Sequence, residues 1–504
     1  MAGNPVAIGP FLGGLNLRED ARQIADNQLA ACINFDIGRA GELTVRPGLK
    51  AFRINGTINL GLPAATYIIG GARLSTTGAS RLFGVQSATR NVYYTDATSS
   101  NAVSWTSTFA GGSTGTFSRT VQYTNKVWFI PKGVGAGGSS TAISHDLSTG
   151  ASTAVTGIPK GSGAIVFKDR LFIFGPLDTA NGGTQRVYYS AATDFTSFPV
   201  NNFFDIAPGD GENVTAAAGS SDTLIFFKQH SVWALQYDTD PGLGTLRKVN
   251  SEIGATGPDS VINFQNEIYI IDERTIWKMQ NFLFDDIGKN LNLGTIRTSV
   301  DFRSLADDTD VFGNRIVFTV ATGVSGLAFR YFAYNTEIGT FSEYRFDEIP
   351  VKFFTITDLS NSETHVAHNA DGSRFYYFQP FNVDDTNWGD YPNNVTHIRF
   401  ETKRFDYDGA HHYKRLFWWG VEAATNTSFQ LSAIVDERLT SAVAAEATTT
   451  ATQGRHGYYR AFLPARFRYV QYILDSVQPG IRMTLLNGTA QITDKREVSA
   501  GATV

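Results

Sequence analysis

The segment Asp169-Arg-Leu-Phe-Ile-Phe decides the fold, because its pattern recurs along the chain. Each copy has a turn residue, often followed by a charged residue, and then at least four β-forming residues. With this copy included, the seven copies begin at Ser80, Asn125, Asp169, Asp222, Asn266, Asn314 and Ser373, at successive spacings of 45, 44, 53, 44, 48 and 59 residues. A fixed period of this size is typical of a repeat architecture.

Each copy predicts a β-hairpin with Asn, Asp or Ser at its turn. Strand-like segments precede the turn, as in Ala164-Ile-Val-Phe, and others follow it, as in Val232-Trp-Ala-Leu. Four short strands in about 40–50 residues are the pattern of a propeller blade. We therefore predict an all-β chain containing a β-propeller of five to eight blades, with six or seven as the best guess and a terminal strand closing the ring. A β-sandwich with irregular hairpins is the alternative.

Composition agrees with β structure and limits the function. The chain has 504 residues, with 37 Phe, 20 Tyr and 49 Gly, and its formal net charge is −5. This acidic balance argues against tight, sequence-independent binding of nucleic acid. Cys32 is the single cysteine, so no disulfide framework or Cys-based metal site is expected. We also expect no signal peptide and no membrane span.

Both ends of the chain depart from the repeat. Residues 1–60 are predicted as an N-terminal extension, 61–392 as the propeller, and 393–504 as an antiparallel, sandwich-like β module. Within the extension, the segment from Asp26 to Phe35 is predicted as a short helix capped by Asp26. The segment from Gly41 to Gly48 is predicted as a strand that ends at Pro47-Gly48.

The extension also carries the residues of a family resemblance. These are Phe11-Leu-Gly-Gly-Leu-Asn, Asp26-Asn-Gln, Asn34, Gly41-Glu-Leu and Arg46-Pro-Gly. Over about residues 10–50 the chain resembles the opening of tail-nozzle or tail-tube proteins of tailed bacteriophages, especially short-tailed ones. Lys414-Arg-Leu-Phe-Trp-Trp and Arg468-Tyr-Val-Gln-Tyr are similar to the family's C-terminal module. The resemblance implies a β-propeller followed by a β module.

The resemblance further implies a structural virion protein, assembled in the host cytoplasm, that forms a homohexameric ring in the tail. Such a ring extends the DNA conduit from the portal and adaptor, retains the genome and then lets it pass. The expected partners are other copies of the chain, portal and adaptor proteins, tail fibres or spikes, and double-stranded DNA in transit without specific binding. The candidate subunit contacts are Phe11, Gly13, Gly14, Asn16, Asn34, Arg46, Pro47 and Gly48. For Arg46 we expect a carboxylate or carbonyl of a neighbouring subunit, the alternative being a surface arginine beside a local turn.

Net charge suggests how DNA would slide through such a ring. A lumen lined by carboxylates repels the phosphate backbone and discourages adhesion. The candidate channel-lining residues are Asp205, Asp210, Glu212, Asp384 and Asp385. We predict no enzyme and no cofactor. Two alternatives stay open: a tail-tip propeller that reads a host glycan through Trp388, Tyr391 and Asp384–Asp385, and a propeller glycoside hydrolase.

Motifs for other chemistry do not meet their structural requirements. Gly133-Val-Gly-Ala-Gly-Gly has the glycine spacing of a phosphate loop, but no helix pattern follows it. His365 and His368 are three residues apart, so on a strand they face opposite sides and cannot chelate together. We therefore expect no metal site.

Overall fold

The structure is a computed structural model of the 504-residue chain. It describes residues 5–494 except 52, 55–65, 74–79, 87–90, 98–100, 103–105, 110–115, 118–119, 133–140, 176–184, 298–307, 323–327, 347–349, 358–362, 370–374, 379–389, 391–394, 408–412, 426–428, 437, 446–455 and 480–482. The described residues are almost entirely β, apart from a 3₁₀ turn, η2 (Pro241–Leu243), and one turn of helix, α1 (Leu293–Ile296). No helix among them is long and apolar enough to cross a membrane.

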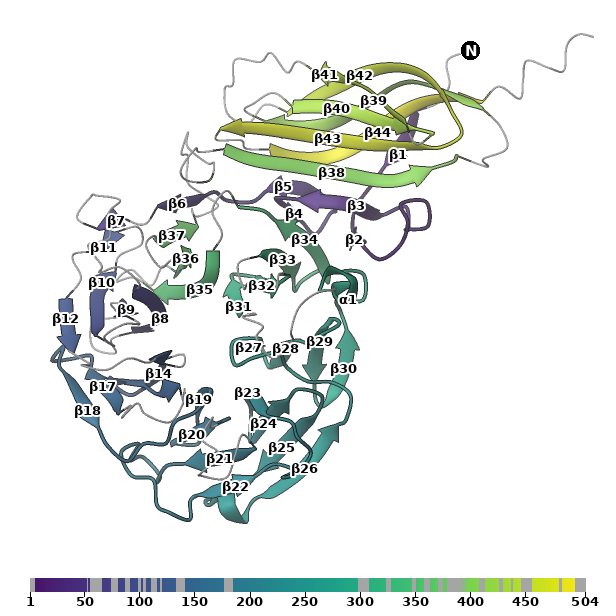
Figure 1. The fold of residues 1–504 in the computed structure, drawn as a ribbon. Coiled ribbons are helices and arrows are strands. Elements are labelled where there is room, and N and C mark those ends of the chain that lie inside the picture. Colours follow the sequence, from purple (N-terminus) through teal and green to yellow (C-terminus); the bar gives the residue numbers. More distant parts are fainter. Residues whose placement is uncertain are drawn as a thin grey trace, which may run out of the picture.

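Seven antiparallel meanders form a closed ring, which confirms the predicted propeller (Figure 1). Six of the meanders are separate sheets, and the remaining one is part of a larger sheet of ten strands. Blade one consists of β8 (Thr66–Arg73), β9 (Ser80–Gln86), β10 (Val92–Ala97), β11 (Asn101–Ala102) and β12 (Thr106–Phe109). Blade two consists of β14 (Val121–Tyr123), β15 (Lys126–Phe129), β17 (Ala142–Asp146) and β18 (Ser152–Val155). Blade three consists of β19 (Gly163–Phe167), β20 (Arg170–Phe174), β21 (Arg186–Tyr189) and β22 (Phe203–Asp205).

Blades four to seven repeat this order. They consist of β23 (Val214–Ser220), β24 (Thr223–Lys228), β25 (Val232–Gln236) and β26 (Thr245–Asn250); β27 (Val261–Phe264), β28 (Glu267–Ile271), β29 (Ile276–Gln280) and β30 (Leu283–Asp286); β31 (Asp308–Phe312), β32 (Arg315–Ala321), β33 (Phe329–Asn335) and β34 (Thr340–Tyr344); and β35 (Pro350–Thr357), β36 (Glu363–Asn369), β37 (Phe375–Phe378) and β6 (Leu49–Ala51). Two short strands, β13 (Thr116–Phe117) and β16 (Pro131–Lys132), pair with each other beside the second blade.

Within a blade, the chain runs from the ring centre outward (Figure 1). The first hairpin turns at the predicted residues: Lys168 and Asp169 have φ of 45° and 57°, and Gln265 and Asn266 have φ of 54° and 64°. Two consecutive left-handed residues match the twist of a tight hairpin, and Asn and Asp tolerate this conformation. The first strands of blades seven and one, β35 and β8, contact each other and so bring the two ends of the ring together.

Aromatic side chains fill the space between neighbouring blades. Phe172 of blade three lies 6.5 Å from Phe226 of blade four, ring centroid to centroid, and Phe226 lies 5.7 Å from Phe204. These rings are tilted or edge-on to one another, as aromatic pairs prefer. A blade cannot bury both of its faces alone, so stacking against the next blade provides the core.

The N-terminal segment closes the ring. β6 (Leu49–Ala51) pairs antiparallel with β37 and supplies the outermost strand of blade seven. The next strand, β7 (Arg53–Ile54), pairs parallel with β11 of blade one. The expectation that a terminal strand closes the ring is confirmed.

The C-terminal module is a sandwich of two sheets. One sheet has the order β4 (Phe35–Ile37), β5 (Leu43–Val45), β44 (Met483–Asp494), β39 (Lys414–Thr425) and β42 (His456–Phe467), with β1 (Pro5–Ile8) paired to β44. The other contains β2 (Gly14–Leu15), β3 (Gln28–Ile33), β38 (Val395–Phe405), β43 (Val470–Pro479), β40 (Phe429–Val435) and β41 (Arg438–Ala445). Trp419 is fully buried between the sheets, 5.2 Å from Tyr472 and 6.5 Å from Phe400.

Two expectations for the N-terminal extension are wrong. It is not a separate unit, because β1–β5 are strands of the sandwich and β6 belongs to the propeller. The predicted helix from Asp26 to Phe35 is instead the strand β3, which pairs with β38 on one side and with β34 on the other. Strand partners on both sides outweigh the weak helix preference of its Ala-rich sequence. Asp26 accepts a hydrogen bond from Lys403 Nζ at 2.7 Å rather than capping a helix.

Candidate functional sites

The junction between propeller and sandwich is built around Arg46, which directly follows β5 and is fully buried. Its Nη2 lies 2.6 Å from Asp390 Oδ2 and its Nη1 3.0 Å from Asp390 Oδ1, so the pair is bidentate. Nη2 also donates to the Arg345 carbonyl at 2.7 Å, and the guanidinium lies over the Phe346 ring, 4.3 Å from its centroid. A buried guanidinium needs this full set of partners, because an unpaired buried charge is strongly destabilising.

Asn34 connects this arginine to both domains. It adopts a left-handed conformation, with φ of 59°, directly after β3. Its Nδ2 donates to the His397 carbonyl on β38 at 2.7 Å. Its Oδ1 accepts from Arg46 Nε at 2.8 Å and from the Arg345 amide at 2.7 Å. One side chain thus joins the sandwich, the N-terminal segment and blade six.

A second buried ion pair lies nearby, and sequence reasoning missed it. Asp36 on β4 pairs with Arg315 of blade six, with Nε 2.9 Å from Oδ1, and accepts a hydrogen bond from the Tyr344 hydroxyl. Burial raises the pKa of Asp36, and the Arg315 charge partly offsets this. No local signal marks these residues, because Asp36 and Arg315 are far apart in sequence.

The N-terminal segment 11–16, which contains Gly13 and Gly14, packs tightly against blade six and β3. Gly14 has φ of 67°, and a Cβ there would lie 2.8 Å from the Thr340 Cβ, so glycine is required. Phe11 is buried, with its ring 5.6 Å from that of Phe400. Asn16 is buried and its Nδ2 donates to Gln28 Oε1 at 2.9 Å.

These contacts correct the role predicted for the N-terminal motif. Of the eight candidate subunit contacts, Gly13 is half-buried and the other seven are buried inside the chain. The carboxylate that pairs with Arg46 is in the same chain, so the arginine is neither an inter-subunit contact nor a surface residue. Of the motif residues Phe11, Gly13, Gly14, Asn16, Asn34, Arg46, Pro47 and Gly48, three contact the propeller: Asn34 and Arg46 hydrogen-bond to the backbone of Arg345, and Gly14 packs against Thr340 of blade six.

The three described acidic candidates each have a basic partner. Asp205 on β22 pairs with Arg186 on the neighbouring strand, with Oδ1 2.9 Å from Nε. Asp210, in the loop from β22 to β23, lies 2.5 Å from the fully buried Lys228 ammonium. Because these carboxylates are compensated within the chain, they contribute less to a repulsive field than their number suggests. Asp384 and Asp385 lie outside the described residues.

Glu212 belongs to a charged cluster that spans two blades. His230, in the turn from β24 to β25, has Nδ1 2.8 Å from Glu212 Oε1 and Nε2 3.3 Å from Glu273 Oε1. Burial lowers the pKa of His230, but the Glu212 hydrogen bond and the charges of Glu273 and Glu212 outweigh this, so the net shift is upward. Beside it, burial raises the pKa of Asp272 to about 6.

This cluster does not form a metal site. Among the described residues, no three or more His, Cys, Asp or Glu side chains are placed to hold a metal ion. The histidine separates the two glutamates and hydrogen-bonds or pairs with each, so the group is a polar contact between blades four and five. Gly133–Gly138, the motif with phosphate-loop spacing, lies outside the described residues.

Comparisons with known proteins identify no family. No family model matches the chain, and no curated protein matches it. Among solved structures, one described as the crystal structure of BBS1N in complex with ARL6DN, soaked with lead, is similar over 67% of this chain and 99% of that chain. The identity is 11% and the TM-score 0.43.

Proposed function

We propose that this chain is a structural protein of a phage tail, a nozzle or tail-tube subunit that forms a homohexameric ring. The observation that carries the proposal is the place of the motif residues that resemble the nozzle family. Seven of the eight candidate residues are buried within the chain, and Asn34, Arg46 and Gly14 contact blade six from the N-terminal segment. A motif used in this way belongs to the architecture of the whole chain and not to one local turn.

The geometry of the junction suits a mechanical role. Arg46, Asp390 and Asn34 connect strands of both domains through short, buried hydrogen bonds. The strand β3 pairs with β38 of the sandwich and with β34 of the propeller, so one sheet of ten strands runs through both domains. Packed and hydrogen-bonded junctions of this kind move as one body. A conduit under pressure from packaged DNA requires such a subunit.

In this proposal, the negative charge of the assembled ring allows DNA to pass without adhering. Six copies at −5 each carry a total of −30, which disfavours adhesion of the phosphate backbone. Portal and adaptor proteins on one side, and fibres or spikes on the other, are the partners the proposal implies. The chain would be made in the host cytoplasm and retained in the virion tail.

The test is the oligomeric state and location of the protein. We expect purified protein to form a ring with an axial channel in negative-stain images, and labelled antibody to mark the tails of phage particles. A monomer that binds glycans on an array would overturn the proposal in favour of receptor recognition. Sugar turnover that disappears on an Asp→Asn change would favour a hydrolase.

A further inference from the structure

Both ring nitrogens of His230 face carboxylates that come from different parts of the propeller. Glu212, 2.8 Å from Nδ1, lies in the connection from blade three to blade four. Glu273, 3.3 Å from Nε2, lies in the β28–β29 turn of blade five. His230 itself lies in the β24–β25 turn of blade four, so one imidazole joins connections that belong to three consecutive blades.

Only the protonated imidazole satisfies this geometry in full. An ionised carboxylate accepts hydrogen bonds, and a neutral imidazole has one N–H donor, whereas the imidazolium has two. If His230 were neutral, one of its ring nitrogens would direct a lone pair at a carboxylate oxygen. Loss of the proton therefore removes one of the two bridges and places an acceptor against an acceptor. The side chain is 46% exposed, so the ring exchanges its proton directly with solvent.

A third carboxylate strengthens the preference for the protonated ring. Asp272, next to Glu273, is 7% exposed. Its carboxylate accepts hydrogen bonds from the Trp277 indole at 3.2 Å and from the Glu273 amide at 2.5 Å. The buried ammonium of Lys228, in the same strand–turn segment as His230, is already paired with Asp210 at 2.5 Å. The negative charge around the imidazole is therefore balanced chiefly by the imidazole itself.

The other charged groups on the elements packed against this turn are engaged elsewhere or exposed. Lys248 lies over the Trp233 ring, Arg297 donates to the Asp272 carbonyl, Asp259 pairs with Lys352, Asp286 accepts from Thr275, and Glu252 and Arg274 are exposed. The groups whose charges act on His230 are thus Glu212, Glu273 and Asp272.

The directions of titration agree with this geometry. Burial lowers the pKa of His230, but the Glu212 hydrogen bond and the neighbouring carboxylate charges outweigh it, so the pKa is raised. Its contribution to stability is complete below the unfolded value of about 6.5 and is lost as the pH rises through the folded value. Burial raises the pKa of Asp272 to about 6, so its contribution is lost between about pH 4 and pH 6. Both groups favour the contact at low pH.

An apolar seam beneath the polar cluster keeps the two blades together in either state. Phe227 and Val232 of blade four and Ile268 and Ile270 of blade five are buried in one hydrophobic cluster. Packing of this kind does not depend on pH. Loss of the polar bridge therefore loosens the connections at one end of the seam and leaves the propeller folded.

We propose that His230 is a proton-operated clamp at the seam between blades four and five. When protonated, it holds the Glu212 connection and the Glu273 turn together. When neutral, it releases them and leaves three carboxylates close to one another. The clamp lies within a single chain, so it does not depend on the proposed role in a phage tail.

An NMR titration tests whether His230 has the required protonation behaviour. With ¹³C-labelled histidine, the ring signal that is missing from His230→Gln identifies His230 among the eight histidines. We expect its midpoint above pH 6.5, and we expect Glu212→Gln and Glu273→Gln each to lower it by about half a pH unit or more. A midpoint at or below 6.5, or one that neither variant lowers, overturns the proposal.

Hydrogen exchange tests whether the contact itself responds to pH. After correction for intrinsic exchange, residues 229–231 and 272–275 should exchange about fivefold faster at pH 8 than at pH 6.5, as expected for one lost hydrogen bond to a charged group. His230→Gln should lose most of this difference, whereas Asp272→Asn should keep it. Equal corrected rates at the two pH values in the wild type, or the full difference in His230→Gln, overturn the proposal.

His397→Gln is the matched control for both measurements. His397 is also a partly exposed histidine beside a carboxylate, with Nε2 3.2 Å from Asp475, but it lies on β38 in the sandwich. The variant should leave the His230 midpoint and the pH response of residues 272–275 unchanged. A change as large as that in His230→Gln would show a global effect of charge and overturn the local clamp.

Discussion

Replacing Asp390 by alanine tests the junction most sharply. The change removes both carboxylate oxygens from the Arg46 guanidinium, at 2.6 and 3.0 Å, and one of them from the Leu49 amide, at 2.9 Å. Arg46 has no exposed surface, so water cannot replace the lost acceptor. Leaving one member of a buried ion pair without its partner lowers the free energy of unfolding by about 3–5 kcal/mol, and the unsatisfied Leu49 amide lowers it by about 1 kcal/mol more.

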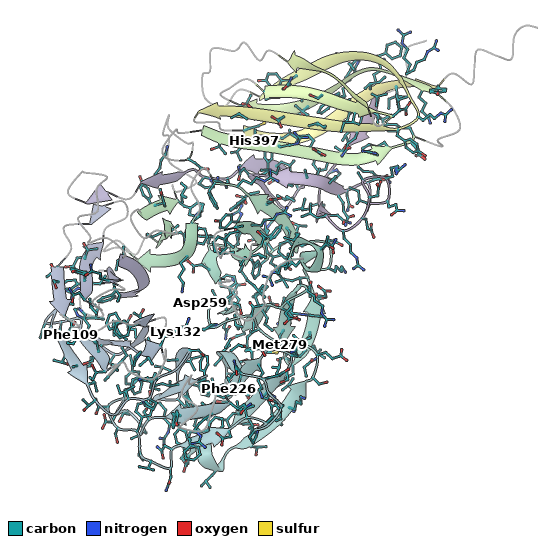
Figure 2. All side chains as sticks on the ribbon, in the orientation of Figure 1. Phe109, Lys132, Phe226, Asp259, Met279 and His397 are labelled. Atoms are coloured by element: carbon teal, nitrogen blue, oxygen red, sulfur yellow. The ribbon has the colours of Figure 1, made fainter. Side chains whose placement is uncertain are left out.

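We therefore expect Asp390→Ala to lower the free energy of unfolding by about 4–6 kcal/mol in urea titrations. Because Leu49 begins β6, hydrogen exchange should accelerate at residues 49–51 and 375–378, where blade seven closes. Figure 2 shows the described side chains of the sandwich, with His397 labelled on its lower strand, and of the blades below it.

Two controls make the result interpretable. Asp96→Ala breaks an ion pair of the same length, 2.6 Å to Arg81, but Asp96 is half exposed, so a loss below about 1 kcal/mol is expected. Arg46→Met with Asp390→Leu removes both charges and should recover most of the loss. A loss for Asp390→Ala as small as that of Asp96→Ala would refute the reasoning.

Three further predictions concern single residues. Burial, followed by the nearby Arg81 charge, lowers the pKa of His145 to about 4. Neutral His145 therefore contributes about 3 kcal/mol to the free energy of unfolding above pH 6.5, and this contribution is lost as the pH falls toward 4. His145→Gln should reduce the dependence of stability on pH in that window, and an unchanged slope would contradict this. Gly254→Ala should destabilise the protein strongly, because the new Cβ would lie 1.9 Å from the backbone oxygen of Gln229. Gly294→Ala, which has open space around it in α1, should stabilise the protein by about 0.5–1 kcal/mol. Equal shifts in the thermal unfolding midpoint of the two variants would contradict the packing described around Gly254. Burial raises the pKa of the Cys32 thiol, so it should react with a thiol reagent only after denaturation; rapid native labelling would contradict the fold at β3.

The repeat was the part of the fold that could be predicted from sequence. A hairpin is local, so turn residues such as Asp169 and Asn266 mark it directly, and both occupy the expected left-handed turns. Seven such copies in phase were enough to predict a propeller.

Long-range partners were not predictable from sequence. Asp390, the partner of Arg46, is 344 residues away, and no local pattern links them. The segment from Asp26 to Phe35 was predicted as a helix because its strand neighbours, β38 and β34, come from distant parts of the chain. Asp205, Asp210 and Glu212 were predicted from sequence as channel-lining residues, and their basic partners become visible only in the folded chain.

The use of β6 in blade seven has a consequence for biosynthesis. Residues 49–51 leave the ribosome early, but their partner β37 ends at residue 378, and the sandwich strands that enclose β1 and β5 finish only at residue 494. The propeller therefore cannot close before residue 378 has been made, and the sandwich cannot be completed before residue 494. Premature termination before residue 378 leaves an open circle of blades with an exposed sheet edge, and termination between residues 378 and 494 leaves the edges of the sandwich exposed, so a partial product should be recognised as defective rather than incorporated into an assembly.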